Sequence, residues 1–472
     1  MKYTSRYFFI LAIALAPVLL FLEQLAYSGD VIVEKINDRL RSCTSSELGA
    51  TSSDILYEFE CTSLAYLDEF VITEGQDAVL NLFGKGLIQI KIAKINNNIV
   101  DKLTVKSNFS VDIDNPVPKS FTNRFGFSNQ EAKVITINTR EYEPGWYQII
   151  TKDTQGQLFQ LVLFIESLEL SNILFVESTD TLIAYNRSYR NTGIPNNYKR
   201  SISQVNRSAF PKKIPIEYKF TPSKFFPIRC DSHLMLADIV LKQHLQRNGV
   251  GFTEIADSRL DLPTTYDSVD TIIFGSHNEY WTQDKLQHLS AFVERGGKLL
   301  FLGGNQAYRE IRRHNYYWII QGVGINDNFK KDKESYSAIA ELMGTFFKGD
   351  MGTGDSLKVT NAEIWRNKFK VEINDADVLG DGSDFSYCVS PHTLGRINLI
   401  SGASSIETDQ LIDDVNGFYL LAKGMQENGG ADVVYKEFKG GGKILNFSSV
   451  GLWHSLSDPH IADLINSFIH KN

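Results

Sequence analysis

In the stretch DTIIFGSHNEYWTQDKLQHLSAFVERGGKLLFLGGN, which runs from Asp270 to Asn305, two apolar runs flank one amphipathic segment. Thr271–Ser276 and Lys298–Leu302 are rich in β-branched and apolar residues, a pattern typical of strands buried on both faces. Gln283–Glu294 between them has its apolar residues on one helical face, and two glycines follow it as a helix stop. The stretch therefore predicts a parallel strand–helix–strand unit.

Polar side chains stand where these strands end. His277 and Glu279 follow the first strand, and Asn305 follows the second. Tyr185 lies a few residues past an earlier predicted strand, Asn172–Val176. In open α/β sheets the ligand crevice lies outside the carboxyl ends of the strands. We therefore expect these four side chains to gather within hydrogen-bond or one-water reach of a common point.

The His277-x-Glu279 pair has more than one interpretation. Two residues apart on an extended chain, both side chains point the same way and can share one metal ion or one water. The alternative is a capping glutamate beside a hydrogen-bonded histidine at a strand end. A Ser-His-Asp set is a further possibility that the spacing does not favour. Its members would be Ser276, Ser448, His454 and Asp458.

The 472 residues are enough for two or three domains. Residues 1–28 predict a signal peptide or membrane anchor, and residues 29–68 a lead-in of helix and loop. Short alternating strands over 69–166 predict a small immunoglobulin-like β-sandwich. Alternating strands and helices over 168–472 predict an α/β domain with a parallel sheet. Within it we expect a hairpin at 433–447, a closing helix at 461–470, and loops with a few antiparallel strands over 315–400.

The N-terminus predicts export. Lys2 and Arg6 precede Phe8–Leu22, a run of fifteen residues with only apolar side chains. The sequence leaves open whether the segment is cleaved or stays as a membrane anchor. In an oxidising compartment Cys43 and Cys61 are the expected disulfide, with Cys230–Cys388 as its companion. Four free buried thiols are the alternative.

The charge balance bears on partners. The net charge is −8, and Lys and Arg are scattered rather than clustered. A nucleic-acid surface would need a basic patch, so no nucleic-acid partner is expected. A small-molecule substrate is expected instead, and the oligomeric state is left open.

Several of these motifs resemble one family. GSHNEYWT at Gly275–Thr282 and GGKLLFLGGN at Gly296–Asn305 resemble two signature segments in the C-terminal region of the large (beta) subunit of N,N-dimethylformamidase. AYN at Ala184–Asn186 is similar to a third, and GWYQIITKD at Gly145–Asp153 to the edge of the preceding β-module. The resemblance extends over roughly Glu69–Asn305, and more weakly over 440–450.

The resemblance implies a class I glutamine amidotransferase-like (flavodoxin-like) fold without the catalytic cysteine. It also implies a mononuclear ferric site of two tyrosinates and one glutamate that hydrolyses a small amide. Tyr185 and Glu279 would be iron ligands, with His277 and Asn305 beside them to bind water or substrate. Such oxygen ligands suit a ferric ion. The family's second tyrosine is missing, because this chain has Phe210 in the corresponding segment, and Tyr198 or Tyr218 would have to substitute.

Two main hypotheses follow. The first is an exported, metal-dependent hydrolase of amide or related C–N bonds, with His277, Glu279 and Asn305 as catalytic residues and iron as its cofactor. The second is a non-catalytic binding or scaffold protein that keeps the fold and has lost the metal. A third, carbohydrate chemistry at the cell surface, rests on analogy of architecture alone.

Overall fold

The structure is a computed structural model that describes a large part of the chain. The described ranges are 44–50, 55–60, 63–95, 104–116, 120–122, 132–156, 158–184, 209–211, 235–313, 317–320, 333–381, 402–413, 415–427 and 429–470. Tyr185, the apolar N-terminal run and all four cysteines lie outside them. Within these ranges, no helix has the length and apolar character needed to cross a membrane.

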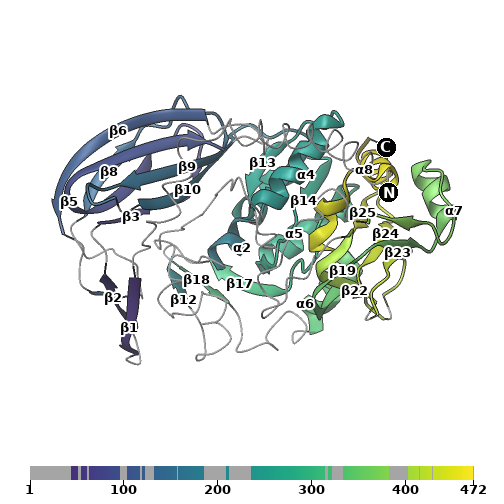
Figure 1. Cartoon of the computed structure of the whole chain (residues 1–472). Helices are drawn as coiled ribbons and strands as arrows, with labels where there is room; N and C mark the ends of the chain where they lie inside the picture. Colours follow the sequence, from purple (N-terminus) through teal and green to yellow (C-terminus); the bar gives the residue numbers. More distant parts are fainter. Residues whose placement is uncertain are drawn as a thin grey trace, which may run out of the picture.

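The N-terminal unit is a seven-stranded sheet, antiparallel except for one pair (Figure 1). Its strands are β3 (Ser63–Leu67), β4 (Val71–Thr73), β5 (Ala78–Lys94), β6 (Thr104–Asn115), β8 (Lys133–Ile137), β9 (Gly145–Lys152) and β10 (Leu158–Glu166). A separate three-stranded sheet contains β1 (Thr44–Ala50), β2 (Ile55–Glu60) and β7 (Ser120–Thr122). The expected helix-and-loop lead-in is therefore wrong where it is described, because that segment forms β1, β2 and β3.

Strand β5 organises this unit. Its first half pairs with β3 and β8, and its second half pairs with β6 and β9. The sequence predicted two strands, 78–82 and 87–95, with a break between them. The chain stays in the sheet through that point because Gly86 adopts a φ of +84°, which glycine tolerates without strain. One strand thereby lines both halves of a single core that includes Leu80, Leu82 and Ile90.

The C-terminal unit contains a nine-stranded sheet. Five strands are parallel, in the order β13 (Thr253–Ala256), β11 (Ile173–Glu177), β14 (Thr271–Phe274), β16 (Lys298–Phe301) and β25 (Lys443–Asn446). The antiparallel strands β24 (Asp432–Glu437), β23 (Tyr419–Gly424), β20 (Leu357–Val359) and β21 (Val378–Leu379) extend the sheet beyond β25. Numbered along the chain, the parallel strands stand in the order 2-1-3-4-5. The predicted neighbours β11 and β14 and the predicted hairpin of β24 and β25 are confirmed.

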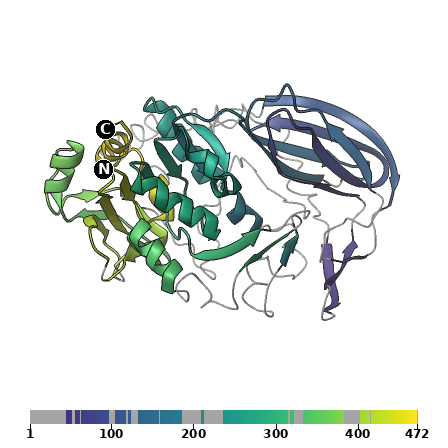
Figure 2. The same cartoon turned by 180° about the vertical axis from the view of Figure 1, so that it is seen from behind.

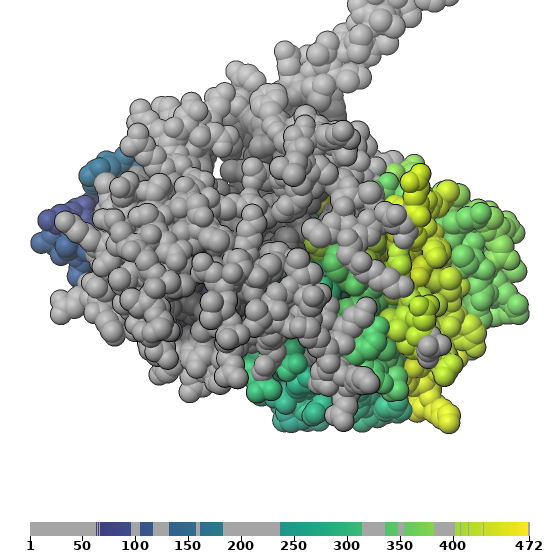
Figure 3. Space-filling view, turned by 90° about the horizontal axis from the view of Figure 1, so that it is seen from below, coloured from purple at the N-terminus to yellow at the C-terminus, as the bar shows by residue number. Residues whose placement is uncertain are grey.

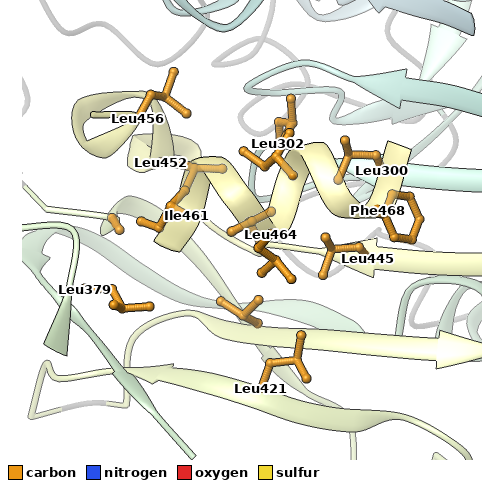
Figure 4. Close-up of a cluster of buried hydrophobic side chains, with 14 of the residues drawn as sticks. Leu300, Leu302, Leu379, Leu421, Leu445, Leu452, Leu456, Ile461, Leu464 and Phe468 are labelled. Atoms are coloured by element: carbon orange, nitrogen blue, oxygen red, sulfur yellow. The ribbon is translucent and has the colours of Figure 1, made fainter. Parts of the chain in front are cut away.

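Helices cover both faces of the parallel strands, which Figures 1 and 2 view from opposite sides. The helices α4 (Met235–Arg247) and α8 (Pro459–His470) pack on one face, and α5 (Gln283–Glu294) and α6 (Lys333–Met343) on the other. Strand β14 shows the alternation, since Ile273 joins the first core cluster while Ile272 and Phe274 join the second. In the first cluster, Leu464 and neighbouring residues of α8 lie over the leucines of β16 and β25 (Figure 4). The predicted closing helix is thus confirmed, whereas α6 was not predicted.

Shorter elements surround the sheet. A four-stranded sheet contains β12 (Ala209–Pro211), β18 (Tyr317–Ile320), β17 (Arg309–Arg313) and β15 (Tyr280–Trp281), and β19 (Thr345–Asp355) pairs with β22 (Ser404–Leu411). The short helices are α2 (Thr179–Ala184), α7 (Ala362–Ile364), a π-helix at Trp365–Phe369, and 3-10 helices at Asp257–Asp261, Pro263–Tyr266 and Val450–Ser455. Seen from below, the visible atoms of the C-terminal unit, coloured teal to yellow, gather at the right of the view (Figure 3).

The two units are in direct contact. The Glu166 carboxylate at the end of β10 accepts a hydrogen bond of 2.9 Å from the backbone N–H of Ala256, at the end of β13. Arg259 lies 3.7 Å from the same carboxylate. Ile239 of α4 and Ala256 join the core of the N-terminal unit. The β-sheet unit is therefore held against the edge of the parallel sheet by both apolar and polar contacts.

Candidate functional site

The candidate site lies at the carboxyl ends of β14 and β16. The strand order reverses between β11 and β14, because the chain adds β13 on one side of β11 and all later strands on the other. A crevice at such a reversal is where parallel α/β sheets bind their ligands. His277 and Glu279 follow β14 here, and Asn305 follows β16.

The structure brings His277 and Glu279 together. Nε2 of His277 lies 3.3 Å from Oε2 of Glu279, and both residues are 1% exposed. The backbone N–H of Glu279 donates a 3.1 Å hydrogen bond to Oγ1 of Thr181, which belongs to α2. The other carboxylate oxygen of Glu279 lies 3.7 Å from Nε of Arg309. Glu279 therefore lies between two basic side chains.

Asn305 is held in an unusual backbone conformation. Its φ is +49°, in the left-handed region that few non-glycine residues adopt, although asparagine does so more readily than most. The backbone also approaches β22 closely here, because a Cβ on the preceding Gly304 would meet the backbone oxygen of Glu407 at 2.5 Å. Nδ2 of Asn305 donates to Oε2 of Glu407 at 2.8 Å, and its backbone N–H donates to Oδ1 of Asp409 at 2.9 Å.

Glu407 links Asn305 to the pair of His277 and Glu279. The same Oε2 that accepts from Asn305 lies 3.6 Å from Nδ1 of His277. The imidazole of His277 thus lies between Glu279 on one side and Glu407 on the other. Asn305 does not reach His277 by any direct contact between described residues. Its link to the histidine runs through Glu407.

Glu407 and Asp409 were missed by the sequence analysis. Both lie on β22, two residues apart and so on the same face of the strand. A bridge between Thr408 and Ser449, together with a 2.8 Å hydrogen bond from the Asp409 N–H to the Ser448 oxygen, places β22 across the end of β25. Two acidic residues at this spacing were the available signal. It is weak, because the same pattern is common on exposed strands.

Burial and the neighbouring charges together set the pKa values of this cluster. Burial alone would lower the pKa of His277. The carboxylates of Glu407 and Glu279 raise that pKa by more than burial lowers it, so the net shift is upward. Burial raises the pKa of Glu407, against the favourable field of His277. Burial also raises the pKa of Asp409 to about 8, against the hydrogen bond from the Asn305 N–H. The imidazole therefore keeps its proton to higher pH than a free histidine does.

Of the ferric site that the family resemblance implies, the described residues include one ligand, Glu279. Across the described ranges, no three or more His, Cys, Asp or Glu side chains are arranged to hold a metal ion. One oxygen of Glu279 faces His277 and the other faces Arg309. Tyr185 follows α2 directly but lies outside the described residues, as do Tyr198 and Tyr218.

The alternative Ser-His-Asp set does not assemble. Ser276 donates its hydroxyl to Asp238, and Asp458 accepts from backbone N–H groups at the start of α8. His454 is completely buried, and burial lowers its pKa to about 3. Oγ of Ser405, which is not a member of the set, lies 3.5 Å from Nδ1 of His454. These groups serve the packing of the domain.

Comparison with known proteins agrees with the site motifs. Residues 132–463 match the family described as N,N-dimethylformamidase beta subunit-like, C-terminal. No curated protein matches the chain. Solved structures with local similarity include a beta-galactosidase from Rahnella sp. R3 (12% identity, TM-score 0.31, 63% of this chain and 30% of that one). Another is a ThuA-like protein from Bacteroides uniformis (12% identity, TM-score 0.29, 52% and 94%). This chain thus spans under a third of the galactosidase, and both scores are low. The family match covers well over half of the sequence, and the chain belongs to the N,N-dimethylformamidase beta subunit-like, C-terminal family.

Proposed function

We propose that the chain is a hydrolase of amide or related C–N bonds, with His277 and Glu279 at its reaction centre and Asn305 beside them. The observation that carries this proposal is the buried imidazole between the Glu279 and Glu407 carboxylates, at the strand-order reversal. A histidine held by carboxylates is a recurrent general base, because the carboxylate fixes the ring and stabilises its protonated form.

In this proposal His277 moves the protons of the reaction. The neutral form of the imidazole, which the raised pKa confines to higher pH, takes a proton from water as the water oxygen adds to the carbonyl carbon of the substrate. It returns that proton to the leaving nitrogen as the C–N bond breaks, giving a carboxylic acid and an amine. Glu279 and Glu407 fix the ring. Oδ1 of Asn305 has no hydrogen-bond partner among the described residues. In this proposal it accepts a hydrogen bond from water or from the substrate N–H.

The wider architecture belongs to the same proposal. The 2-1-3-4-5 order of the parallel strands supports a flavodoxin-like or amidotransferase-like domain. The shared strand β5 supports an immunoglobulin-like sandwich before it, with the boundary near residue 167. Export, membrane attachment through the N-terminus and the Cys43–Cys61 disulfide fall on residues outside the described ranges. Thiol counting on secreted protein tests the disulfide, and two reactive thiols at 43 and 61 would contradict it.

The functional test is the release of ammonia or amine from a panel of small amides, from formamide to dimethylformamide. Glu279→Gln keeps the size of the side chain and removes its charge. Losing one member of such a unit lowers the rate by roughly 10²- to 10⁴-fold. Glu169→Gln is the matched control, because Glu169 is exposed and distant from the site in the sequence. Equal rates for the two variants would show that Glu279 has no part in the reaction and would contradict the proposed site.

A binding protein without catalysis is the second candidate. The observation that favours it is Phe210 in place of the family's second tyrosine, together with the Arg309 and His277 side chains that face the two oxygens of Glu279. If the wild type hydrolyses none of the amides but a small amide binds and Glu279→Gln weakens that binding, this second function replaces the first.

A further inference from the structure

Arg309 contacts Glu279 through both backbone and side chain. The backbone N–H of Arg309 donates to the carbonyl oxygen of Glu279 at 2.9 Å, next to the pairing of β15 with β17. Nε of Arg309 lies 3.7 Å from Oε1 of Glu279, and the arginine is 3% exposed. Its guanidinium also lies 4.8 Å from the ring centre of Tyr308. The strand pairing therefore fixes the backbone of Arg309 beside Glu279, and the buried side chain places its guanidinium near the carboxylate.

A permanent positive charge at this position opposes a metal ion on the same carboxylate. Arginine does not lose its proton in proteins, so its charge does not depend on pH. Like charges a few ångströms apart repel strongly in a buried site, where water screens them poorly. Of the two iron ligands that the family resemblance implies, Glu279 is the one that the structure describes. Its two carboxylate oxygens face Arg309 and His277.

We infer that Arg309 is a member of this site and supplies the fixed positive charge for Glu279, so that the carboxylate is balanced from within the protein and holds no resident metal ion. The inference concerns what balances Glu279 and does not depend on whether the site is catalytic. It assigns a role to a residue on β17 that none of the sequence motifs included.

The test begins with the full-length wild-type protein. Iron, zinc and manganese are measured by plasma mass spectrometry in protein as isolated, and again after incubation with ferric or zinc ions and removal of the excess. We expect less than about one tenth of an equivalent of metal in both cases, because the fixed charge of Arg309 opposes a second cation on Glu279. A stoichiometric metal in the wild type that Glu279→Gln removes would overturn the inference. The wild-type measurement needs no variant. The Glu279→Gln variant is needed only if the wild type contains a stoichiometric metal.

Variants of Arg309 test the cause. Arg309→Gln removes the charge and should raise the retained metal about tenfold or more over the wild type, whereas Arg309→Lys keeps the charge and should stay near the wild type. Arg312→Gln is the matched control, because Arg312 is on the same strand but exposed. Circular dichroism verifies that each variant is folded. No gain of metal in a folded Arg309→Gln would contradict the inference.

The outcome is separable from that of the proposed hydrolase. An inactive wild type without metal would contradict the hydrolase and leave the role of Arg309 intact. An active wild type with a metal lost in Glu279→Gln would support hydrolysis and overturn the role of Arg309.

Discussion

Lys242 should be one of the most sensitive positions in the protein. It lies on α4 with a side chain that is fully buried, and its Nζ lies 2.6 Å from Glu177 and 3.1 Å from Glu254. Burial works to lower the pKa of Lys242, but the two carboxylates raise that pKa by more, so the lysine stays charged. Lys242→Met removes the charge at nearly constant length and leaves two neighbouring carboxylates without their cation.

The expected loss follows from burial. Removing one partner of a buried ion pair lowers the free energy of unfolding by about 3–5 kcal/mol, since an uncompensated charge stays in the interior. Lys368→Met is the control, because Lys368 also lies 2.6 Å from a carboxylate, that of Glu437, but both side chains are more than a third exposed. An exposed pair contributes only about 0–1 kcal/mol.

Urea unfolding followed by circular dichroism measures both variants. Burial raises the pKa of Glu177, so its protonation at lower pH should remove part of the repulsion left by Lys242→Met. The pKa of Glu177 is about 8 beside Lys242 and higher without that cation, so the deficit relative to wild type should be smaller at pH 7 than at pH 9. Equal losses for the Lys242 and Lys368 variants, or a deficit for Lys242→Met that does not change with pH, would refute the argument.

Three further changes test the fold. Leu464→Ala opens a cavity under α8 and should lower the free energy of unfolding by about 2–5 kcal/mol, whereas Leu262→Ala, at a side chain 48% exposed, should change it by less than about 0.5 kcal/mol. His454 has a pKa lowered by burial to about 3, so the wild type should lose stability as the pH falls from about 6.5 towards 3, by roughly 1.4 kcal/mol per unit. His454→Gln should reduce this loss of stability at acid pH in thermal melts. An unchanged loss would contradict the role given to His454. Gly303→Ala places a Cβ 2.0 Å from the backbone oxygen of Ser276, just after β14, and should prevent folding, while Gly251→Ala, with no atom within 4 Å, should fold normally in the same melts.

The parallel sheet could be predicted because its signals are local. The strands β11, β14, β16 and β25 are short runs of apolar residues, and their own composition favours a buried strand. The pairing of β19 with β22 had no such signal. Strand β19 carries the polar and glycine run Lys348–Asp350 in its middle, and it pairs with a segment about fifty residues or more away.

The same distinction applies to the site. His277, Glu279 and Asn305 could be chosen as candidates because polar residues at the ends of predicted parallel strands stand out in the sequence. Arg309 and Glu407 were not found, because they are on strands outside the parallel set. Their proximity to Glu279 and His277 depends on how β17 and β22 cross the strand ends, and no local pattern encodes that crossing.

The position of β22 also sets the time at which the site can form during synthesis. Asn305 and Glu407 are 102 residues apart in the chain. At about 5–20 residues per second, the ribosome needs roughly 5–20 s to make the intervening segment. His277 and Glu279 therefore leave the ribosome well before the carboxylate that completes their cluster. Contacts of such large sequence separation form late in folding, because the long loop must close first. The nascent chain thus already contains all strands of the N-terminal seven-stranded sheet while the candidate site is still incomplete.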